Sequence, residues 1–179
     1  MKRYIALFRG INIGGKNKID MSKLKEAFAE LGFTDITTYL NSGNVIFSSV
    51  IDDKNVLSNK VKRIIKDRFD LDIPVFIVLQ EKLKELLINA PDWWGDSNKE
   101  IYDNIIFLLP PLSYEEFFDE IGKPKAEYEK VHNYKNVIFW SFSRKDYQKT
   151  NWWSKTARAN VKDKITIRTA NTVRKIVGL

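Results

Sequence analysis

The amino-acid sequence predicts an α+β fold of two tandem ferredoxin-like (βαββαβ) halves, each with a four-stranded antiparallel sheet, followed by a C-terminal helix. Two observations predict this fold. Short runs rich in β-branched and aromatic residues alternate with segments in which apolar residues recur at helical spacing. The order strand, helix, strand, strand, helix, strand occurs over residues 1–79 and again within residues 80–179, after a linker helix at about 80–89. We therefore predict an N-terminal domain at 1–79 and a second domain at 80–179.

The first half begins with the apolar strand RYIALF at 3–8, which leads through a long loop to a helix. Asp20 is the expected N-cap of that helix, and Gly32 its C-terminal stop. The remaining predicted elements are strands at 33–40 and 44–50 separated by the hairpin signal NSG, a helix at about 53–69, and a strand at 73–79.

The second half repeats this order without a visible sequence repeat. Ser113 and Glu116 match a capping box that opens a short helix ending at Gly122. The other predicted elements are strands at 104–109, 127–131, 137–142 and 165–168, a helix at about 151–160, and a last helix at 170–177. Strands 127–131 and 137–142 are expected to pair across the sequence HNYKN, which places His132 at the hairpin.

Composition narrows the range of functions. The chain of 179 residues has no cysteine and a single histidine, His132, so it can form neither a disulfide nor a metal site that needs thiolates or two histidines. We expect no metal and no cofactor. No apolar run approaches the ~18 residues of a membrane span. We therefore expect a cytoplasmic protein without a membrane partner.

The loop after the first strand has the glycine and lysine spacing of a P-loop, with Gly10, Gly15 and Lys16 in the matching positions. Asn17, however, occupies the position of the Ser or Thr that ligates magnesium, and the helix starts only at about Asp20. Nucleotide hydrolysis is therefore not predicted. A simpler anion site remains open, with side chains and exposed backbone amides as donors. The alternative is that the glycines only allow positive φ in a long turn.

The predicted topology places a second polar segment beside this loop. The first and second strands of a βαββαβ unit are parallel, so the loop at 9–19 and the turn Asn41–Asn44 must lie at the same sheet edge. A third polar segment follows the last strand, where a helix N-terminus with free N–H groups favours anions. The candidate ligand-binding residues from these segments are Arg9, Asn12, Gly14, Gly15, Lys16, Asn41, Ser42, Asn44, Arg168, Asn171 and Thr172.

The net charge of +7 is concentrated near the C-terminus. Residues 144–179 hold ten Lys or Arg against two acidic residues, whereas the rest holds 20 against 21. Such an excess indicates an anionic partner, or only a solvated face. Trp153 and Ala157 are four residues apart and are expected to face the core, which leaves Trp152 exposed to stack on a base. The candidate nucleic-acid contacts are Lys149, Trp152, Lys155 and Arg158.

Three motifs carry a resemblance to a known family. The sequences ALFRGINIGGKNKIDMSKLKEAFAELGF, TYLNSGNVIF and TIRTANTVRKI resemble the bacterial family of domain of unknown function 1697. Family members usually carry Arg-Asn where this chain has Arg168–Thr169. The resemblance implies an α+β fold and brings no established activity with it.

Three classes of function are compatible with these features. The first, which we favour, is a binding module for a phosphate-bearing ligand (a nucleotide, a metabolite or nucleic acid) at the Arg9–Lys16 loop. The second is a metal-independent enzyme acting on a phosphorylated metabolite. The third is a protein-interaction module that forms a homodimer. No acid–base pair or nucleophile can be assembled from the sequence, so no reaction is predicted.

Overall fold

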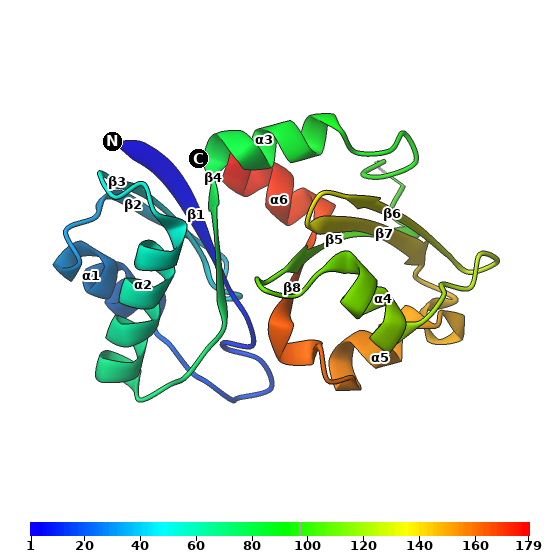
Figure 1. The fold of residues 1–179 in the computed structure, drawn as a ribbon, viewed down its shortest axis with the longest axis horizontal. Coiled ribbons are helices and arrows are strands. Elements are labelled where there is room, and N and C mark those ends of the chain that lie inside the picture. Colours follow the sequence, from blue (N-terminus) through cyan, green and yellow to red (C-terminus); the bar gives the residue numbers. More distant parts are fainter. Residues whose placement is uncertain (97) are drawn as a thin grey trace. The chain divides into compact units, whose positions relative to one another are not determined.

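The computed structural model describes residues 1–96 and 98–179. These residues form an α+β structure with two four-stranded antiparallel sheets and six α-helices (Figure 1). The chain divides into two compact units, which are described one at a time. Unit 1 comprises Met1–Glu85 and Lys175–Leu179, and unit 2 comprises Leu86–Arg174. No helix in the described part of the chain is long and apolar enough to cross a membrane.

Unit 1 contains a sheet with the strand order β2-β3-β1-β4. Its elements are β1 (Lys2–Phe8), α1 (Met21–Glu30), β2 (Thr34–Tyr39), β3 (Asn44–Ser49), α2 (Lys54–Phe69), β4 (Val75–Leu79) and most of α3 (Gln80–Ile88). Both β1 and β2 pair antiparallel with β3. The two strands therefore run in the same direction, and the segments that follow them leave the sheet at the same edge.

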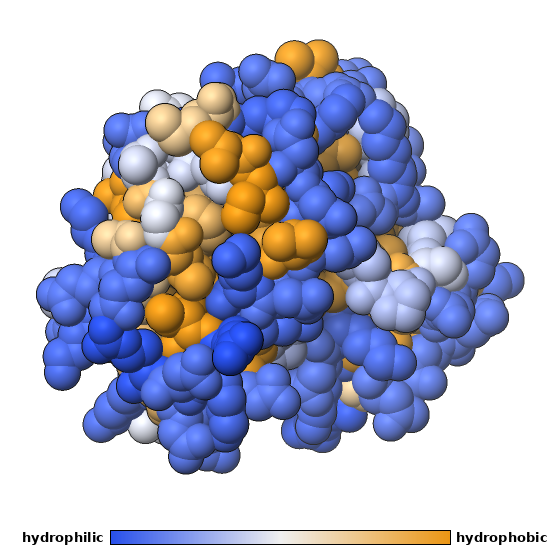
Figure 2. Space-filling model, turned by 60° about the vertical axis from the view of Figure 1, so that its left-hand side comes forward, coloured by the Kyte–Doolittle hydropathy of each residue, from blue (hydrophilic) through white to orange (hydrophobic). Residues whose placement is uncertain are grey.

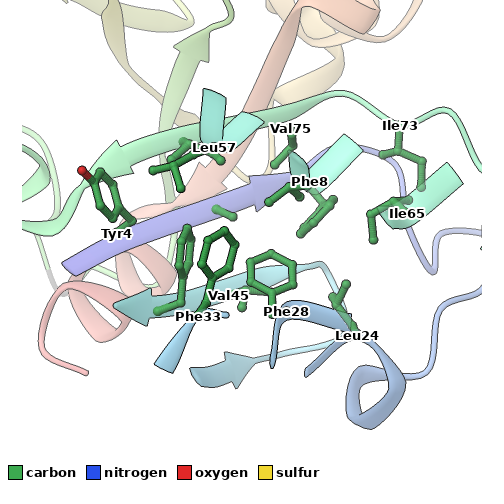
Figure 3. Packing of buried hydrophobic residues seen from close by; sticks show 14 of the residues in the cluster. Tyr4, Phe8, Leu24, Phe28, Phe33, Val45, Leu57, Ile65, Ile73 and Val75 are labelled. Carbon is green, nitrogen blue, oxygen red and sulfur yellow. The ribbon is translucent and has the colours of Figure 1, made fainter. Parts of the chain in front are cut away.

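The core of unit 1 lies between this sheet and the helices α1 and α2 (Figure 3). Alternate residues of β1, Tyr4 and Phe8 among them, point to the same face of the sheet, where they are fully or almost fully buried. Phe28 of α1 meets Phe47 of β3 edge to face, with ring centroids 5.2 Å apart. Phe33 stacks on the same Phe47 ring at 4.5 Å. The aromatic side chains therefore hold α1 in a defined position on the sheet.

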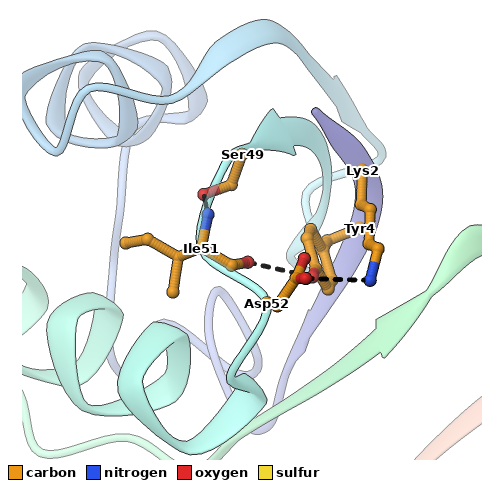
Figure 4. A network of polar contacts seen from close by, with 5 residues as sticks. All are labelled: Lys2, Tyr4, Ser49, Ile51 and Asp52. Carbon is orange, nitrogen blue, oxygen red and sulfur yellow. Dashed lines mark hydrogen bonds and ion pairs between the residues drawn. The ribbon is translucent and has the colours of Figure 1, made fainter.

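The connection from β3 to α2 is tied to the beginning of β1 (Figure 4). The Tyr4 hydroxyl donates to the carbonyl oxygen of Ile51 at 2.9 Å, and the Lys2 ammonium lies 3.1 Å from Asp52. The backbone N–H of Ile51 donates to Ser49 Oγ at 3.0 Å. Burial raises the pKa of the Tyr4 hydroxyl, which keeps it protonated and able to donate.

The two units do not have the same boundaries as the two predicted domains. The start and the end of the second half both differ. The predicted boundary follows residue 79, whereas unit 1 extends to Glu85 and also includes the last five residues, Lys175–Leu179. Long-range hydrogen bonds explain the return of the C-terminus to unit 1. Gln80 Nε2 donates to the carbonyl oxygen of Val177 at 3.0 Å, and Arg3 Nη2 donates to that of Leu179 at 3.3 Å.

Unit 2 contains the second sheet, with the strand order β6-β7-β5-β8. Its elements are β5 (Ile101–Leu108), α4 (Tyr114–Ile121), β6 (Glu129–Tyr134), β7 (Val137–Ser143), α5 (Trp152–Arg158), β8 (Ile165–Thr169), most of α6 (Ala170–Val177), and two 3₁₀ turns at Tyr147–Lys149 and Lys162–Lys164. The capping box of Ser113 and Glu116 is confirmed at the start of α4. His132 is exposed. It belongs to strand β6, because the hairpin turn lies between Tyr134 and Val137. Its predicted place at the turn is therefore wrong.

A buried carboxylate organises the core of unit 2. Glu129, only 3% exposed, begins β6 and accepts hydrogen bonds through both of its side-chain oxygens. Its Oε1 accepts from the backbone N–H groups of Lys125 (2.9 Å) and Asn151 (2.7 Å). Its Oε2 accepts from the indole N–H of Trp140 at 2.9 Å and from the backbone N–H of Trp152 at 3.4 Å. This single side chain therefore connects β7 to the start of α5.

Candidate functional site

The loop between β1 and α1 is itself a small hairpin. The backbone N–H of Lys16 donates to the carbonyl oxygen of Ile13 at 3.0 Å, and that of Asn12 donates to Asn17 at 3.1 Å. The two central residues, Gly14 and Gly15, have φ values of 56° and 77°. Positive φ at both central positions is the signature of a type I′ turn, for which glycine is strongly preferred. The turn therefore accounts for these two glycines without a bound phosphate.

Asparagine side chains hold this hairpin to its surroundings. Asn12 Oδ1 accepts from the backbone N–H of Ile19 at 2.8 Å, and Asn12 Nδ2 donates to the carbonyl oxygens of Ile19 and Asn41, both at 2.9 Å. Asn17 Nδ2 donates to the carbonyl oxygen of Gly10 at 2.9 Å. The bond from Asn12 to Asn41 joins the loop to the turn after β2, as the parallel arrangement of β1 and β2 requires.

The turn after β2 packs against the beginning of the same loop. Gly43, with a φ of 80°, accepts a hydrogen bond from the backbone N–H of Phe8 at 2.9 Å. A Cβ atom at Gly43 would lie 2.8 Å from Phe8 Cβ and 2.5 Å from Ile11 Cδ1. Asn44 is fully buried and donates to the carbonyl oxygen of Tyr39 at 2.7 Å. Asn44 therefore stabilises the turn from the inside of the unit.

A hollow of about 550 Å³ opens between the loop, the turn and the start of α1. The polar residues that line it are Asn12, Lys18, Asp20, Ser22 and Asn41, and the other lining residues are Gly15, Ile19 and Met21. Three predicted site residues, Asn12, Gly15 and Asn41, thus share one surface, while Arg9, Lys16, Ser42 and Asn44 do not line the hollow. Lys18 is the functional candidate that the sequence analysis missed, although it stands two residues after Lys16 in the same loop.

The lysines of the loop are the cations available to a ligand here. Lys16 and Lys18 are both exposed, and neither forms an ion pair with another described residue. The first N–H groups of α1, by contrast, are already occupied. Asp20 accepts from the backbone N–H groups of Ser22 (2.8 Å) and Lys23 (3.1 Å) as the predicted N-cap. These backbone N–H groups are therefore not free to bind an anion in the hollow.

The stability that the Asp20 carboxylate contributes is expected to disappear in acid. Hydrogen bonds from the Ser22 side chain and from two backbone N–H groups lower the pKa of Asp20 from its ordinary 3.8. The unfolded chain therefore binds this proton more readily than the folded one, so the contribution is complete above about pH 5 and is lost as the pH falls through the lowered pKa. The free energy of unfolding in urea should be higher for wild type than for Asp20→Ala at pH 7, and this difference should shrink toward about pH 2.5. A difference that stays constant with pH, or an equal trend for Asp72→Ala, would contradict this assignment.

The C-terminal candidates serve mainly structural contacts. Arg168 is buried, and its Nη1 donates at 2.9 Å to both Thr166 Oγ1 and the carbonyl oxygen of Ile167. Thr172 is nearly buried, and its backbone N–H reaches Thr169 Oγ1 at 3.4 Å. Only Asn171 of the three predicted residues is exposed, and it lines a separate pocket of about 200 Å³ in unit 2.

The predicted exposure of Trp152 is wrong. Trp152 is fully buried, donates through Nε1 to the carbonyl oxygen of Gly122 at 2.8 Å, and meets Phe117 edge to face. Trp153 is instead 43% exposed. The pair Trp152–Thr156 has the same i, i+4 spacing as Trp153–Ala157, so periodicity alone could not choose between them. A base cannot stack on Trp152 in this structure.

The lysines proposed to contact nucleic acid have intramolecular partners. Lys149 forms an ion pair with Asp146 at 2.8 Å, and the hydrogen bond and charge of Asp146 raise the pKa of Lys149. Lys155 Nζ donates to the carbonyl oxygen of Ile121 at 2.8 Å. Arg158 is exposed at the end of α5. The basic C-terminal region is thus, in part, a set of local contacts within unit 2.

Hydrophobic side chains also reach the surface, among predominantly hydrophilic ones (Figure 2). Near the hollow, Ile13 at the loop hairpin is 64% exposed and Leu40 at the turn is 53% exposed. Within residues 1–96 and 98–179, no three His, Cys, Asp or Glu side chains are grouped so that they could hold a metal ion. The hollow therefore combines one lysine, Lys18, with amide and hydroxyl groups, and apolar side chains lie nearby.

The protein is thus of the α+β class and consists of two compact units, the first of which carries the hollow lined by Lys18. The chain belongs to the family described as "Protein of unknown function (DUF1697)", whose model matches residues 1–139. This match confirms the membership indicated by the loop and hairpin motifs. The C-terminal motif lies beyond the matched residues.

A solved structure extends the similarity to nearly the whole chain. It is described as that of conserved bacterial protein SP0830 from Streptococcus pneumoniae, with 30% sequence identity and a TM-score of 0.86. The similarity covers 99% of this chain and 97% of that one. A comparison with curated proteins found no match. Neither the family description nor that of the solved structure states an activity, so function has to be argued from the site.

Proposed function

We propose that unit 1 is a binding module for a small phosphate-bearing molecule, which it takes into the hollow beside the loop hairpin. One observation carries this proposal: Lys18 lines a hollow of about 550 Å³ and has no ion-pair partner in the described chain. Lys16, also without an ion-pair partner among the described residues, follows the lining residue Gly15 in the sequence. Lysine is a flexible, strongly hydrated point charge and a common phosphate ligand.

The other groups of the hollow support a small ligand with polar substituents. The volume falls within the ~300–1,000 Å³ typical of small-molecule sites. Asn41 and Ser22 present amide and hydroxyl groups, which suit the hydroxyls of a sugar or nucleoside. Asp20 lies on the α1 side of the hollow, so the phosphate would lie toward Lys16 and Lys18, away from this carboxylate.

Replacing Lys18 by Ala is expected to weaken binding of such a ligand at least tenfold, because one charge-assisted contact contributes about 1.5–3 kcal/mol. Lys16→Ala should have a similar or smaller effect. Thermal-shift and calorimetric titration with inorganic phosphate, ATP, GMP, glucose 6-phosphate and a short RNA would identify the ligand class. A rise in Tm with a phosphate compound, reduced by Lys18→Ala, is the expected result.

The matched control is Lys60→Ala, which removes an exposed lysine of α2 outside the hollow. If Lys18→Ala and Lys60→Ala weakened ligand binding equally, only the overall charge of the protein would matter. This result would refute the site. Absence of any shift with the whole panel would refute the proposal itself.

We also infer that each unit is a ferredoxin-like half and that the two halves derive from a duplication. The strand orders β2-β3-β1-β4 and β6-β7-β5-β8 support this inference, because the second is the first with four added to each strand number. Each order is reached through the same sequence of strands and helices.

A further inference from the structure

Unit 2 has a polar pocket of its own, separate from the hollow of unit 1. It measures about 200 Å³ and lies where β8 ends and α6 begins. Strand β5 pairs with β8 only from Asn104 onward, so its first residues, Ile101–Asp103, extend past the end of β8. The side of β5 left open by the short β8 forms one wall, and Thr169 and Asn171 form another.

The pocket contains a buried carboxylate with unused acceptor capacity. Asp103 is only 8% exposed. Its Oδ1 accepts a hydrogen bond from the hydroxyl of Ser141, which is itself 4% exposed, and no other hydrogen bond to the Asp103 side chain occurs among the described residues. An ionised carboxylate can accept about four hydrogen bonds. Since burying a carboxylate with few donors is costly, this side chain favours a ligand group that brings several donors.

The outer part of the pocket has the opposite charge. Arg144 and Lys99 are exposed side chains that line it, and the Arg144 guanidinium lies 4.0 Å from the centre of the Tyr102 ring. This stacking holds the guanidinium in place while its N–H groups stay available. Asp96 also lines the pocket, so the lining as a whole carries two positive and two negative groups. A ligand of a single charge would meet repulsion at one end or the other.

We propose that this pocket binds a small zwitterion, such as a free α-amino acid, with its ammonium group on Asp103 and its carboxylate on Arg144 and Lys99. An ammonium supplies three donors to the buried carboxylate, and a guanidinium matches a carboxylate in a bidentate fashion. The small volume limits the ligand to a few non-hydrogen atoms.

NMR titration of the full chain tests this proposal, because the amide signals of Tyr102, Asp103 and Asn171 report directly on the pocket. The probes are glycine, L-alanine, L-serine and L-aspartate. L-alanine is compared with ethylamine, which lacks its carboxylate, and with propionate, which lacks its ammonium. At least one amino acid should shift these signals and bind at least tenfold more tightly than both single-charge analogues. Equal binding of an amino acid and either analogue would overturn the zwitterion assignment, and no shift with any probe would overturn the site.

Two variants identify the contacts independently. Asp103→Asn keeps the shape of the side chain and should weaken amino-acid binding at least tenfold. If this variant fails to fold, Arg144→Gln at the exposed end should still weaken binding about fivefold, whereas Arg158→Gln on α5 should not change it. Loss of binding in Arg158→Gln equal to that in Arg144→Gln would overturn the assignment. Lys18→Ala should leave amino-acid binding unchanged, so failure here and failure of the phosphate site are separate results.

Discussion

Glu129→Gln is expected to destabilise unit 2 by about 3 kcal/mol or more, although it changes one atom of a buried side chain. Both side-chain oxygens of Glu129 accept hydrogen bonds only from N–H groups. Two backbone N–H groups donate to Oε1. The indole N–H of Trp140 and the backbone N–H of Trp152 donate to Oε2. The amide NH₂ of Gln would therefore face donors whichever way it turned. Each buried donor left without an acceptor costs about 1–3 kcal/mol.

Thermal unfolding should register this loss as a fall in Tm of about 6–12 °C, given about 2–4 °C per kcal/mol for a chain of this length. Glu127→Gln is the matched control, because Glu127 is exposed two residues earlier in the same segment. A Glu129→Gln variant as stable as Glu127→Gln would show that the four hydrogen bonds contribute little. Indole fluorescence should change in Glu129→Gln alone, since Trp140 loses its acceptor.

Gly43→Ala is expected to cost about 2–4 kcal/mol, because it combines backbone strain with a clash. The φ of 80° at this position is unfavourable for any L residue with a Cβ. The added atom would also lie 2.8 Å from Phe8 Cβ, which the strand β1 holds in place, and 2.5 Å from Ile11 Cδ1. The turn after β2 would have to move away from the loop hairpin, and the hollow of unit 1 would change shape.

Gly14→Ala separates the two causes. Gly14 also has a positive φ, of 56°, but a Cβ there would meet no atom within 4 Å. Its cost should therefore be only the backbone term of about 1–2 kcal/mol. Urea unfolding of both variants measures the difference. If Gly43→Ala were no more destabilising than Gly14→Ala, the close approach of the turn to Phe8 would be energetically unimportant.

Much of the local structure could be predicted because its causes lie close together in the sequence. Asp20 caps α1, and Ser113 with Glu116 opens α4, since each cap depends on residues within one helical turn. The position of the loop beside the turn could also be predicted. It follows from the order of the strands, which forces β1 and β2 to run in parallel, and the bond between Asn12 and Asn41 is its consequence.

The details of the candidate site could be predicted only in part. Asn12, Gly15 and Asn41 line the hollow as the shared edge suggested, but Arg9 and Lys16 do not, and Lys18 was not selected. Spacing shows that a loop is rich in lysine and glycine, but it does not show toward which side each residue points. The type I′ turn reverses the chain between Ile13 and Lys16, and this reversal decides which lysine lines the hollow.

The sequence by itself determined the α+β class, the order of the elements, the principal caps and the family. These follow from periodicity, turn chemistry and motifs, which act over a few neighbouring residues. Only the tertiary structure decided that Trp152 and not Trp153 is buried, that Glu129 accepts four hydrogen bonds, and that Gly43 lies against Phe8. Each of these depends on atoms brought together from distant parts of the chain. Their positions are set by the packing of whole elements, which no local pattern encodes.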